Sequence, residues 1–440
     1  MILTKEKNEM ICENLSRNEA GELCLAGMSL PELAKQYGTP LYLYDEERIR
    51  ERCRTYLSAV KKSFGEKGRV LYASKAASFK RLYEIMKEEG MGIDVVSSGE
   101  IYTALRAEYP LSSAYFHSNN KTDADIRYAI ESGVGYFVVD NEEELFAINR
   151  IAGELGVSKK VLLRITPGID PHTYSAVATG KVDSKFGSAI ETGQAKEITR
   201  VALNLPNIIL RGFHCHVGSQ VFDSDVYIRT ADVMLTFVAD IYASEGYLAD
   251  ELDIGGGYGV RYIESQPTID IAKNIAEVSA FMKKRAAELD IELPEIAFEP
   301  GRSIVADAGA TVYTVGTVKR IPGYKNYVSV DGGMTDNPRF ALYGSPYTIL
   351  PAERELSDEM TCSVVGRCCE SGDILQENVK MPNDIKRGEL IACLTTGAYH
   401  YSMASNYNRI PRPPVVMLCD GKSYLAVKRE TVADISNLDL

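Results

Sequence analysis

Short apolar runs rich in β-branched residues recur between residues 69 and 299, and longer amphipathic stretches separate them. Strands that alternate with helices build parallel βα units, because each helix carries the chain back to the end of the sheet where the next strand starts. Eight strand-like runs favour a closed (β/α)8 barrel of the TIM type over an open sheet. The predicted strands are 69–74, 92–97, 114–118, 135–140, 161–166, 210–217, 252–255 and 295–299, and the predicted helices include 78–89, 122–132, 142–155, 191–203, 224–245 and 269–289.

After about residue 310 the pattern changes to short strand-like runs separated by Gly, Pro and Asp, which is typical of an all-β domain. Residues 41–44, Leu-Tyr-Leu-Tyr, are one more predicted strand and can mark a crossover between the two domains. We therefore predict a barrel over residues 45–310. Residues 1–44 and 311–440 together are predicted to form a mostly β, sandwich- or barrel-like domain.

Composition narrows the classes of function. The 440 residues include 61 acidic and 49 basic side chains, a net charge of −12, which argues against an extended nucleic-acid surface. No apolar run reaches the ~18 residues of a membrane span. The first residues lack the apolar stretch of a secretory signal, so we expect a cytoplasmic protein. Nine cysteines without a CxxC pair argue against a disulfide framework and a structural zinc site.

The glycine run Gly255-Gly256-Gly257 follows the seventh predicted strand. Glycines let backbone N–H groups close around an anion, since no Cβ blocks the approach. In βα barrels the loops after strands seven and eight commonly bind phosphate. Composition and position therefore predict a phosphate cradle, with a plain tight turn as the alternative.

Two further strand ends carry charged side chains. Glu299 and Arg302 flank a Pro-Gly turn after the eighth strand, where they can meet opposite ends of a small charged ligand or form a structural salt bridge. Lys75 ends the first predicted strand. A desolvated lysine there has a lowered pKa and can form a Schiff base, but most lysines at strand ends are simply solvated.

His214 and His216 alternate on the sixth predicted strand and so are expected to face the same way. A zinc site needs a third ligand of similar quality, and none is evident among His117, His172 and His400, so we predict no metal centre. The pair is then either an imidazole stacked on an aromatic cofactor or a pair of hydrogen-bonded core histidines.

The predicted β domain adds further polar groups. Arg339 and Tyr343 stand one helical turn apart, the pair Cys369-Glu370 follows, and Tyr399 comes later in the chain. Together they supply a cation, two phenols, a thiol and a carboxylate.

As a set, these motifs resemble the alanine-racemase-like (fold type III) pyridoxal-phosphate decarboxylases, and among them the diaminopimelate decarboxylases. The resemblance covers nearly the whole chain and includes 72–76, 92–100, 179–187, 212–220, 255–257, 299–302, 369–373 and 399–408. It implies a barrel that binds pyridoxal 5'-phosphate and a β domain that contributes substrate and dimer contacts. It also implies a homodimer whose subunits share their active sites.

The resemblance assigns a role to each candidate residue. Lys75 corresponds to the lysine that holds the cofactor covalently, His216 to the imidazole on its ring, and Glu299 to the carboxylate on its ring nitrogen. Cys369 corresponds to the thiol near the reacting carbon, and with Glu370 would come from the partner subunit. The implied cofactor-binding set is Lys75, His216, Ser219, Gly255, Gly256, Gly257, Glu299, Arg302 and Tyr399, and the implied substrate-binding set is Arg302, Arg339, Tyr343, Glu370 and Tyr399.

Two of these groups bear on the reaction type. A carboxylate at Glu299 keeps the ring nitrogen protonated and favours a decarboxylase, since the related racemases have an arginine there. A thiol such as Cys369, with an ordinary pKa of about 8.5, can protonate the carbon after carbon dioxide leaves.

The implied reaction is the decarboxylation of meso-2,6-diaminopimelate to L-lysine and carbon dioxide, the last step of lysine biosynthesis. Arg339 with Tyr343 can hold the distal carboxylate, and Glu370 the distal ammonium. A diamine-forming enzyme would leave Arg339 unpaired. Phe340 stands where the family is expected to have a proline, and loop 170–174 also departs from the pattern, so both can reshape the substrate end.

Two alternatives remain at this point. One is a sibling decarboxylase that acts on D-ornithine, D-lysine or a carrier-bound glutamate. The other is a catalytically silent regulatory homologue, which would be expected to lack Lys75, Glu299 or Cys369, whereas the chain has all three.

Overall fold

The computed structural model describes residues 10–169 and 184–440. The chain forms two compact units. The barrel unit comprises Arg52–Gly259 and Thr268–Gly301, and the β unit comprises the N-terminal residues through Glu51, Val260–Pro267 and Arg302–Leu440. Loop 170–174 and most of the stretch 179–187 lie outside the described residues.

The barrel unit is built on eight parallel strands that close on themselves, because the last strand pairs with the first. The predicted (β/α)8 barrel is confirmed, and every predicted strand overlaps an observed one. The strands are β5 (Gly68–Ala73), β6 (Gly92–Val95), β7 (Tyr115–Phe116), β8 (Tyr136–Val139), β9 (Lys159–Thr166), β11 (Ile208–His214), β12 (Glu251–Asp253) and β13 (Glu295–Phe298). A short strand, β10 (Ser188–Ala189), pairs with β9 outside this ring.

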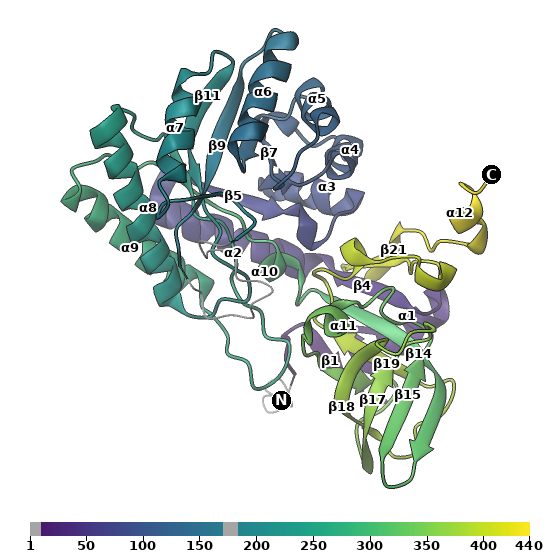
Figure 1. The fold of residues 1–440 in the computed structure, drawn as a ribbon. Helices are drawn as coiled ribbons and strands as arrows, with labels where there is room; N and C mark the ends of the chain where they lie inside the picture. Colours follow the sequence, from purple (N-terminus) through teal and green to yellow (C-terminus); the bar gives the residue numbers. More distant parts are fainter. Residues whose placement is uncertain (1–9, 170–183) are drawn as a thin grey trace. The chain divides into compact units, whose positions relative to one another are not determined.

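Helices follow the barrel strands and surround them (Figure 1). They are α3 (Lys80–Glu89), α4 (Ser98–Arg106), α5 (Asp123–Glu131), α6 (Glu142–Glu154), α7 (Gln194–Asn204), α8 (Ser224–Glu245) and α9 (Ile271–Glu288). Side-chain caps explain where several begin: Thr122 and Asp125 form a capping box on α5, and Asn141 and Asp270 cap α6 and α9.

Helices α2 (Glu46–Phe64) and α4 fall outside the predicted helices. The signal for α2 is present in the sequence, since Ile49, Cys53, Tyr56, Val60 and Phe64 recur at helical spacing and are buried. The many charged residues of α2 between these positions obscure the pattern when the segment is read without its neighbours.

Side chains fill the interior of the barrel, so it is a packed core rather than a pore. Leu71, Tyr115, Tyr136, Val138 and Leu162 form a buried cluster. The rings of Tyr115 and Tyr136 stack with their centroids 4.3 Å apart. This filling leaves the ends of the strands, and the loops beyond them, as the places for a ligand.

The β unit contains a sheet whose main path runs β18-β17-β15-β14-β4-β20-β21. Its strands are β4 (Leu41–Asp45), β14 (Gly309–Ile321), β15 (Lys325–Val330), β16 (Ile349–Pro351), β17 (Glu359–Val365), β18 (Ile374–Pro382), β19 (Leu390–Leu394), β20 (Val415–Cys419) and β21 (Lys422–Val427). As the residue pattern predicts, 41–44 is a strand: β4 lies between β14 and β20, far from both in sequence. The short elements are β1 (Leu15–Arg17), β2 (Leu23–Leu25), β3 (Met28–Ser29), α1 (Leu30–Tyr37), α10 (Arg302–Val305), α11 (Arg339–Tyr343) and α12 (Val432–Ser436).

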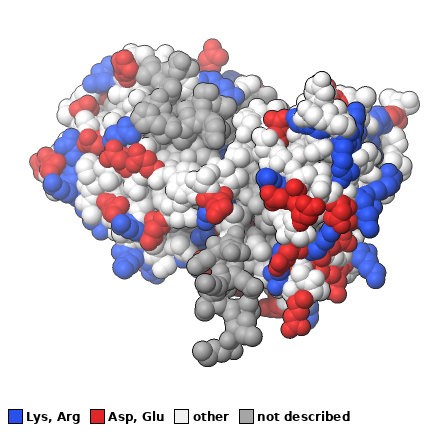
Figure 2. Space-filling model, turned by 90° about the horizontal axis from the view of Figure 1, so that it is seen from below, with Lys and Arg blue, Asp and Glu red and all other residues white. Residues whose placement is uncertain are grey.

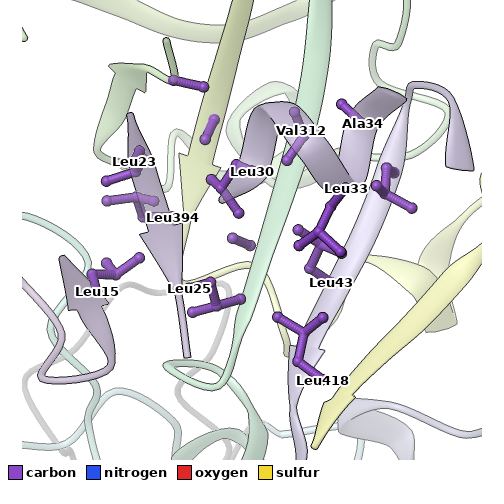
Figure 3. Close-up of a cluster of buried hydrophobic side chains, with 14 of the residues drawn as sticks. Leu15, Leu23, Leu25, Leu30, Leu33, Ala34, Leu43, Val312, Leu394 and Leu418 are labelled. Carbon is purple, nitrogen blue, oxygen red and sulfur yellow. The ribbon is translucent and has the colours of Figure 1, made fainter. Parts of the chain in front are cut away.

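The N-terminal elements share the core of this β unit (Figure 3). Leu25 of β2 and Leu33 of α1 pack in one buried cluster with Leu43, Val312 and Leu394 of the sheet. Each fully buried leucine contributes roughly 1.5–3 kcal/mol to folding. The described part of the first forty residues is therefore an integral part of the β unit.

Charges of both signs are interspersed on the face that Figure 2 shows. Within residues 10–169 and 184–440, no helix is long and apolar enough to cross a membrane.

Candidate active site

The barrel strands bring the first set of candidate residues to one end of the barrel. His214 is the last residue of β11, Gly255 lies two residues after β12, and Glu299 directly follows β13. Lys75 lies in a 3-10 turn, Ser74–Ala76, directly after β5. Because the carboxyl ends of parallel strands meet at the same edge, the fold gathers residues that are far apart in sequence.

Lys75 has an exposed side chain in the structure, whereas the flanking Ser74 and Ala76 are buried. The turn places the lysine outside the apolar run, so its side chain is solvated rather than desolvated. An exposed amine at this edge is accessible to a ligand.

The glycine run approaches neighbouring backbone too closely for any side chain. A Cβ on Gly256 would lie 2.1 Å from the carbonyl oxygen of Glu299, and one on Gly257 would lie 2.3 Å from that of Gly218. Gly257 also has a φ of 105°, in the region that favours glycine. These positions demand glycine for a steric reason, and they hold β12, β13 and the loop after β11 together.

His216 contacts this glycine run directly. The backbone N–H of Gly256 donates to Nδ1 of His216 at 3.4 Å, and the side chain is half-buried. Strand β11 ends at His214, so His216 lies beyond the strand and the alternation of side chains along β11 does not determine which way His216 faces. Ser219 follows in the same loop and is half-buried.

Glu299 is a buried carboxylate between two imidazoles. Its Oε2 lies 3.0 Å from Nε2 of His214 in hydrogen-bond geometry, and its Oε1 lies 2.7 Å from Nε2 of His117. The His117 contact is close but poorly aligned, so Oε1 has no hydrogen bond among the described residues. Burial opposes the charge of Glu299, yet the two imidazoles outweigh it and hold its pKa well below the usual value.

Two more buried acids surround this group. Burial and the nearby charge of Glu299 raise the pKa of Asp94 to about 6 and that of Asp253 well above its ordinary value. Among three neighbouring carboxyl groups, Glu299 is therefore the one that loses its proton most readily. His117, Asp94 and Asp253 are missing from the predicted site, although each lies at or directly after the carboxyl end of a barrel strand.

His117, His214 and Glu299 also have ligand atoms within 4.8 Å of one another, as a metal site requires. Two ligands at the zinc distance in a tetrahedral site lie about 3.3 Å apart. The 2.7 Å contact of His117 and the 3.0 Å hydrogen bond of His214 to Glu299 are both shorter than that spacing.

The second set of candidates lies in the β unit and centres on Arg302. Its Nη1 donates to the hydroxyl of Tyr262 at 2.8 Å, and its guanidinium carbon lies 4.7 Å from the ring centroid of Tyr399. The ring of Tyr262 packs edge-on against Tyr347 at 5.0 Å. Tyr262 and Tyr347 were not predicted, since nothing in their local sequence distinguishes them from core tyrosines.

Arg339 lies in the same cluster. Its guanidinium carbon is 5.1 Å from the ring centroid of Tyr343 and 5.2 Å from that of Tyr399. Helix α11 contains both Arg339 and Tyr343, as their one-turn spacing predicts. The arginine is buried, and its Nε has no hydrogen-bond partner among the described residues. A buried guanidinium with a spare donor is suited to an anionic group.

Cys369 and Glu370 lie in the exposed loop between β17 and β18. The backbone N–H of Cys369 donates to Oδ1 of Asn408 at 2.7 Å, and Oε1 of Glu370 accepts from the N–H of Gly372 at 3.2 Å. These bonds order the loop and leave both side chains at the surface of this chain.

Comparisons with known proteins agree with this arrangement. Residues 46–306 match the family model "Pyridoxal-dependent decarboxylase, pyridoxal binding domain". The diaminopimelate decarboxylase of Bacillus subtilis (strain 168) is 44% identical over 426 residues, which is 96% of each chain. That of Staphylococcus aureus (strain COL) is 42% identical over 418 residues, 95% of this chain and 97% of the relative.

A solved structure extends the likeness to three dimensions. The diaminopimelate decarboxylase of M. jannaschii, in complex with L-lysine, superposes with a TM-score of 0.90 at 32% identity and covers 98% of each chain. Sequence, barrel and β unit therefore agree: the chain belongs to the pyridoxal-dependent decarboxylases and, among them, to the family of the diaminopimelate decarboxylases.

Proposed function

We propose that this protein catalyses the pyridoxal-phosphate-dependent decarboxylation of meso-2,6-diaminopimelate to L-lysine and carbon dioxide. The observation that carries the proposal is the group of residues at the carboxyl ends of the barrel strands: Lys75, His216, the glycine run and Glu299. The 44% identity with a diaminopimelate decarboxylase over 96% of each chain supports the choice of substrate.

The barrel residues fit pyridoxal phosphate. Oε1 of Glu299 is buried and lacks a hydrogen bond among the described residues, so it can accept one from a protonated ring nitrogen. Gly255–Gly257 form a loop without side chains, as a phosphate group requires. Lys75 would hold the cofactor covalently, His216 would pack on its ring, and Ser219 with the glycines would bind its phosphate.

Each side chain then has a defined task. Bound pyridoxal phosphate supplies an electron sink for the carbanion that remains when carbon dioxide leaves. Glu299 would keep a proton on the ring nitrogen, because the two imidazoles beside it hold its pKa well below the usual value and so keep it ionised. Cys369 would deliver the proton from its Sγ to the carbon that lost carbon dioxide.

The β unit supports a substrate with a distal carboxylate. The buried guanidinium of Arg339, with its spare Nε donor, favours an anion and repels an ammonium. Tyr343 lies against it, and Glu370 supplies the carboxylate for a distal ammonium. Diaminopimelate carries both groups at its far end, whereas lysine and ornithine carry only the ammonium.

A substrate panel on the cofactor-loaded protein tests the proposal. Meso-diaminopimelate is compared with D-lysine, D-ornithine, L-ornithine and L-arginine, and carbon dioxide and the amine product are measured. We expect release from meso-diaminopimelate only, with L-lysine as product. Release only from a monocarboxylate would show that a sibling decarboxylase is the correct assignment.

Arginine variants show whether the distal carboxylate is recognised as proposed. Arg339→Gln is expected to raise KM for meso-diaminopimelate at least about tenfold, the equivalent of one charge-assisted hydrogen bond. The matched control is Arg367→Gln, because Arg367 is an exposed arginine of the same unit and is expected to keep wild-type KM. Equal effects in both variants would contradict the role of Arg339.

We also propose that the working form is a homodimer in which the partner subunit supplies Cys369 and Glu370. The exposure of both residues on one chain supports this proposal.

Mixing the inactive variants Lys75→Ala and Cys369→Ala would create heterodimers that contain one intact site. Activity should then return to roughly a quarter of wild type by random pairing in a symmetric dimer. No recovery in a mixture shown to contain heterodimers would mean that each chain completes its own site.

A further inference from the structure

His214 is a buried histidine to which no sequence motif assigned a catalytic role. It is the last residue of β11, its side chain is 1% exposed, and its Nε2 lies 3.0 Å from Oε2 of Glu299. The ring of His117 packs edge-on against it, with the centroids 4.8 Å apart. Its orientation is therefore determined by β11, by Glu299 and by a second imidazole.

The hydrogen bonds of His214 identify its tautomer. Nδ1 is buried and has no hydrogen-bond partner among the described residues. A proton on Nδ1 would be a buried donor without an acceptor, which is costly, whereas a proton on Nε2 has a carboxylate oxygen to bond. Burial also lowers the pKa of His214 to about 3, so the ring is uncharged at neutral pH. His214 is thus a neutral Nε2–H donor.

A neutral donor and a cationic one have different consequences for Glu299. A cationic imidazole would cancel the carboxylate charge and weaken its attraction for a protonated ring nitrogen. A neutral N–H donor orients the carboxylate and stabilises its charge, but does not cancel that charge. The other ionisable groups described around Glu299 are His117, Asp94, Asp253, Arg164, Cys215 and His216.

We propose that His214 is a positioning residue for Glu299: as a neutral Nε2–H donor it holds Oε2 and leaves Oε1 and the full carboxylate charge for the protonated ring nitrogen of the cofactor. The proposal rests on the cofactor assigned under the proposed function. The proposed role of His214 does not depend on which amino acid is decarboxylated.

The test measures the ring nitrogen itself. Holoenzyme is prepared with pyridoxal phosphate labelled with 15N in the ring, and its nitrogen resonance is followed from about pH 6 to about pH 9, across the histidine and thiol titrations. We expect a protonated nitrogen throughout in the wild type. In His214→Leu the pH at which the nitrogen loses its proton should fall by about one unit or more, a tenfold change in the protonation equilibrium.

Two further variants separate positioning from a purely structural effect. His214→Gln keeps an N–H donor on a side chain of similar reach and should restore most of the wild-type nitrogen signal. Tyr115→Phe is the matched control, because the Tyr115 hydroxyl is also a buried donor to a barrel carboxylate, Glu251, at 2.7 Å. Its loss should cost stability and leave the ring-nitrogen titration unchanged.

Wild-type protein gives an independent measurement if His214→Leu does not fold. The chain has only five histidines, so 15N-histidine spectra of the holoenzyme are simple, and the His214 signals are those missing in His214→Gln. We expect a neutral ring protonated at Nε2 at neutral pH. A cationic ring, an Nδ1–H tautomer, a wild-type ring-nitrogen titration in His214→Leu, or an equal shift in Tyr115→Phe would each overturn the proposal.

The same measurements distinguish the two proposals. A protein that binds the labelled cofactor but releases no carbon dioxide from the substrate panel contradicts the proposed function, and its ring-nitrogen titration still decides the role of His214. A protein that binds no cofactor overturns both.

Discussion

The guanidinium carbon of Arg302 lies 4.7 Å from the ring centroid of Tyr399, and Tyr399 itself has a left-handed backbone with φ of 62°. Arg339 approaches the same ring at 5.2 Å, so one phenol ring serves two buried guanidinium groups. Each cation–π contact is worth roughly 0.5–2 kcal/mol, which does not offset the burial of two like charges. We therefore expect the cluster to bind an anionic group, such as a phosphate or a carboxylate, as the proposed function requires.

Tyr262→Phe tests how Arg302 is held. The change removes the hydroxyl that accepts from Arg302 Nη1, a hydrogen bond to a charged group worth about 1.5–3 kcal/mol. We expect pyridoxal phosphate to bind the apoenzyme at least about tenfold more weakly, as measured by absorbance titration. Tyr109→Phe removes another buried hydroxyl, one that donates to the Met91 carbonyl, and should bind the cofactor normally. Wild-type affinity in Tyr262→Phe would show that Arg302 needs no such support.

Gly256→Ala tests the glycine loop. The new Cβ would lie 2.1 Å from the Glu299 carbonyl oxygen, so the backbone after β12 or β13 must move. We expect a loss of stability of about 1–3 kcal/mol and a loss of cofactor binding. Thermal unfolding and cofactor titration measure the two effects. The control is Gly316→Ala, where the nearest atom to a Cβ is 3.7 Å away. Full cofactor binding by Gly256→Ala would contradict the proposed phosphate cradle.

Cys369→Ala tests the proposed proton donor. Loss of a general acid typically reduces turnover by about 10²–10⁴-fold, so kcat should fall by that factor while cofactor affinity stays close to wild type. Cys419→Ala, a cysteine of the same unit that is only partly buried, should keep its activity. If turnover is unchanged, another group must protonate the carbon.

The stability of the β unit should depend on pH through Asp336. Burial raises the pKa of Asp336 to about 7, above its ordinary value of 3.8, despite the hydroxyl donor of Tyr313 at 2.6 Å. The folded state then binds more protons than the unfolded state between these values, so stability falls as pH rises from about 4 to about 7.

Asp336→Asn should flatten this dependence, as measured by denaturation midpoints across the same pH range. The variant also changes hydrogen bonds, so the slope against pH is the informative quantity and the absolute stability is not. Asp420→Asn, at an exposed position, should leave the slope as in the wild type. A slope in Asp336→Asn equal to that of the wild type would contradict the assignment.

Much of the fold could be predicted from local patterns. Each barrel strand is a short apolar run with its own turn signals, and residues 41–44 stand out as a strand for the same reason. Helix α2 shows the limit, since its buried positions repeat every three to four residues and yet are separated by charges. Its apolar face becomes clear only when the sheet and helices it packs on are present.

The candidate site likewise has one part that local sequence patterns predict and another part that they do not. Lys75, Glu299 and the glycine run lie at or just after the ends of barrel strands. Their neighbourhood therefore follows from the number and order of the strands, which the sequence specifies through local hydrophobic periodicity. The neutral tautomer of His214, the raised pKa of Asp253 and the support of Arg302 by Tyr262 depend on burial and on contacts between residues distant in the chain. Only the tertiary structure decided these features, because desolvation and hydrogen bonding act through space.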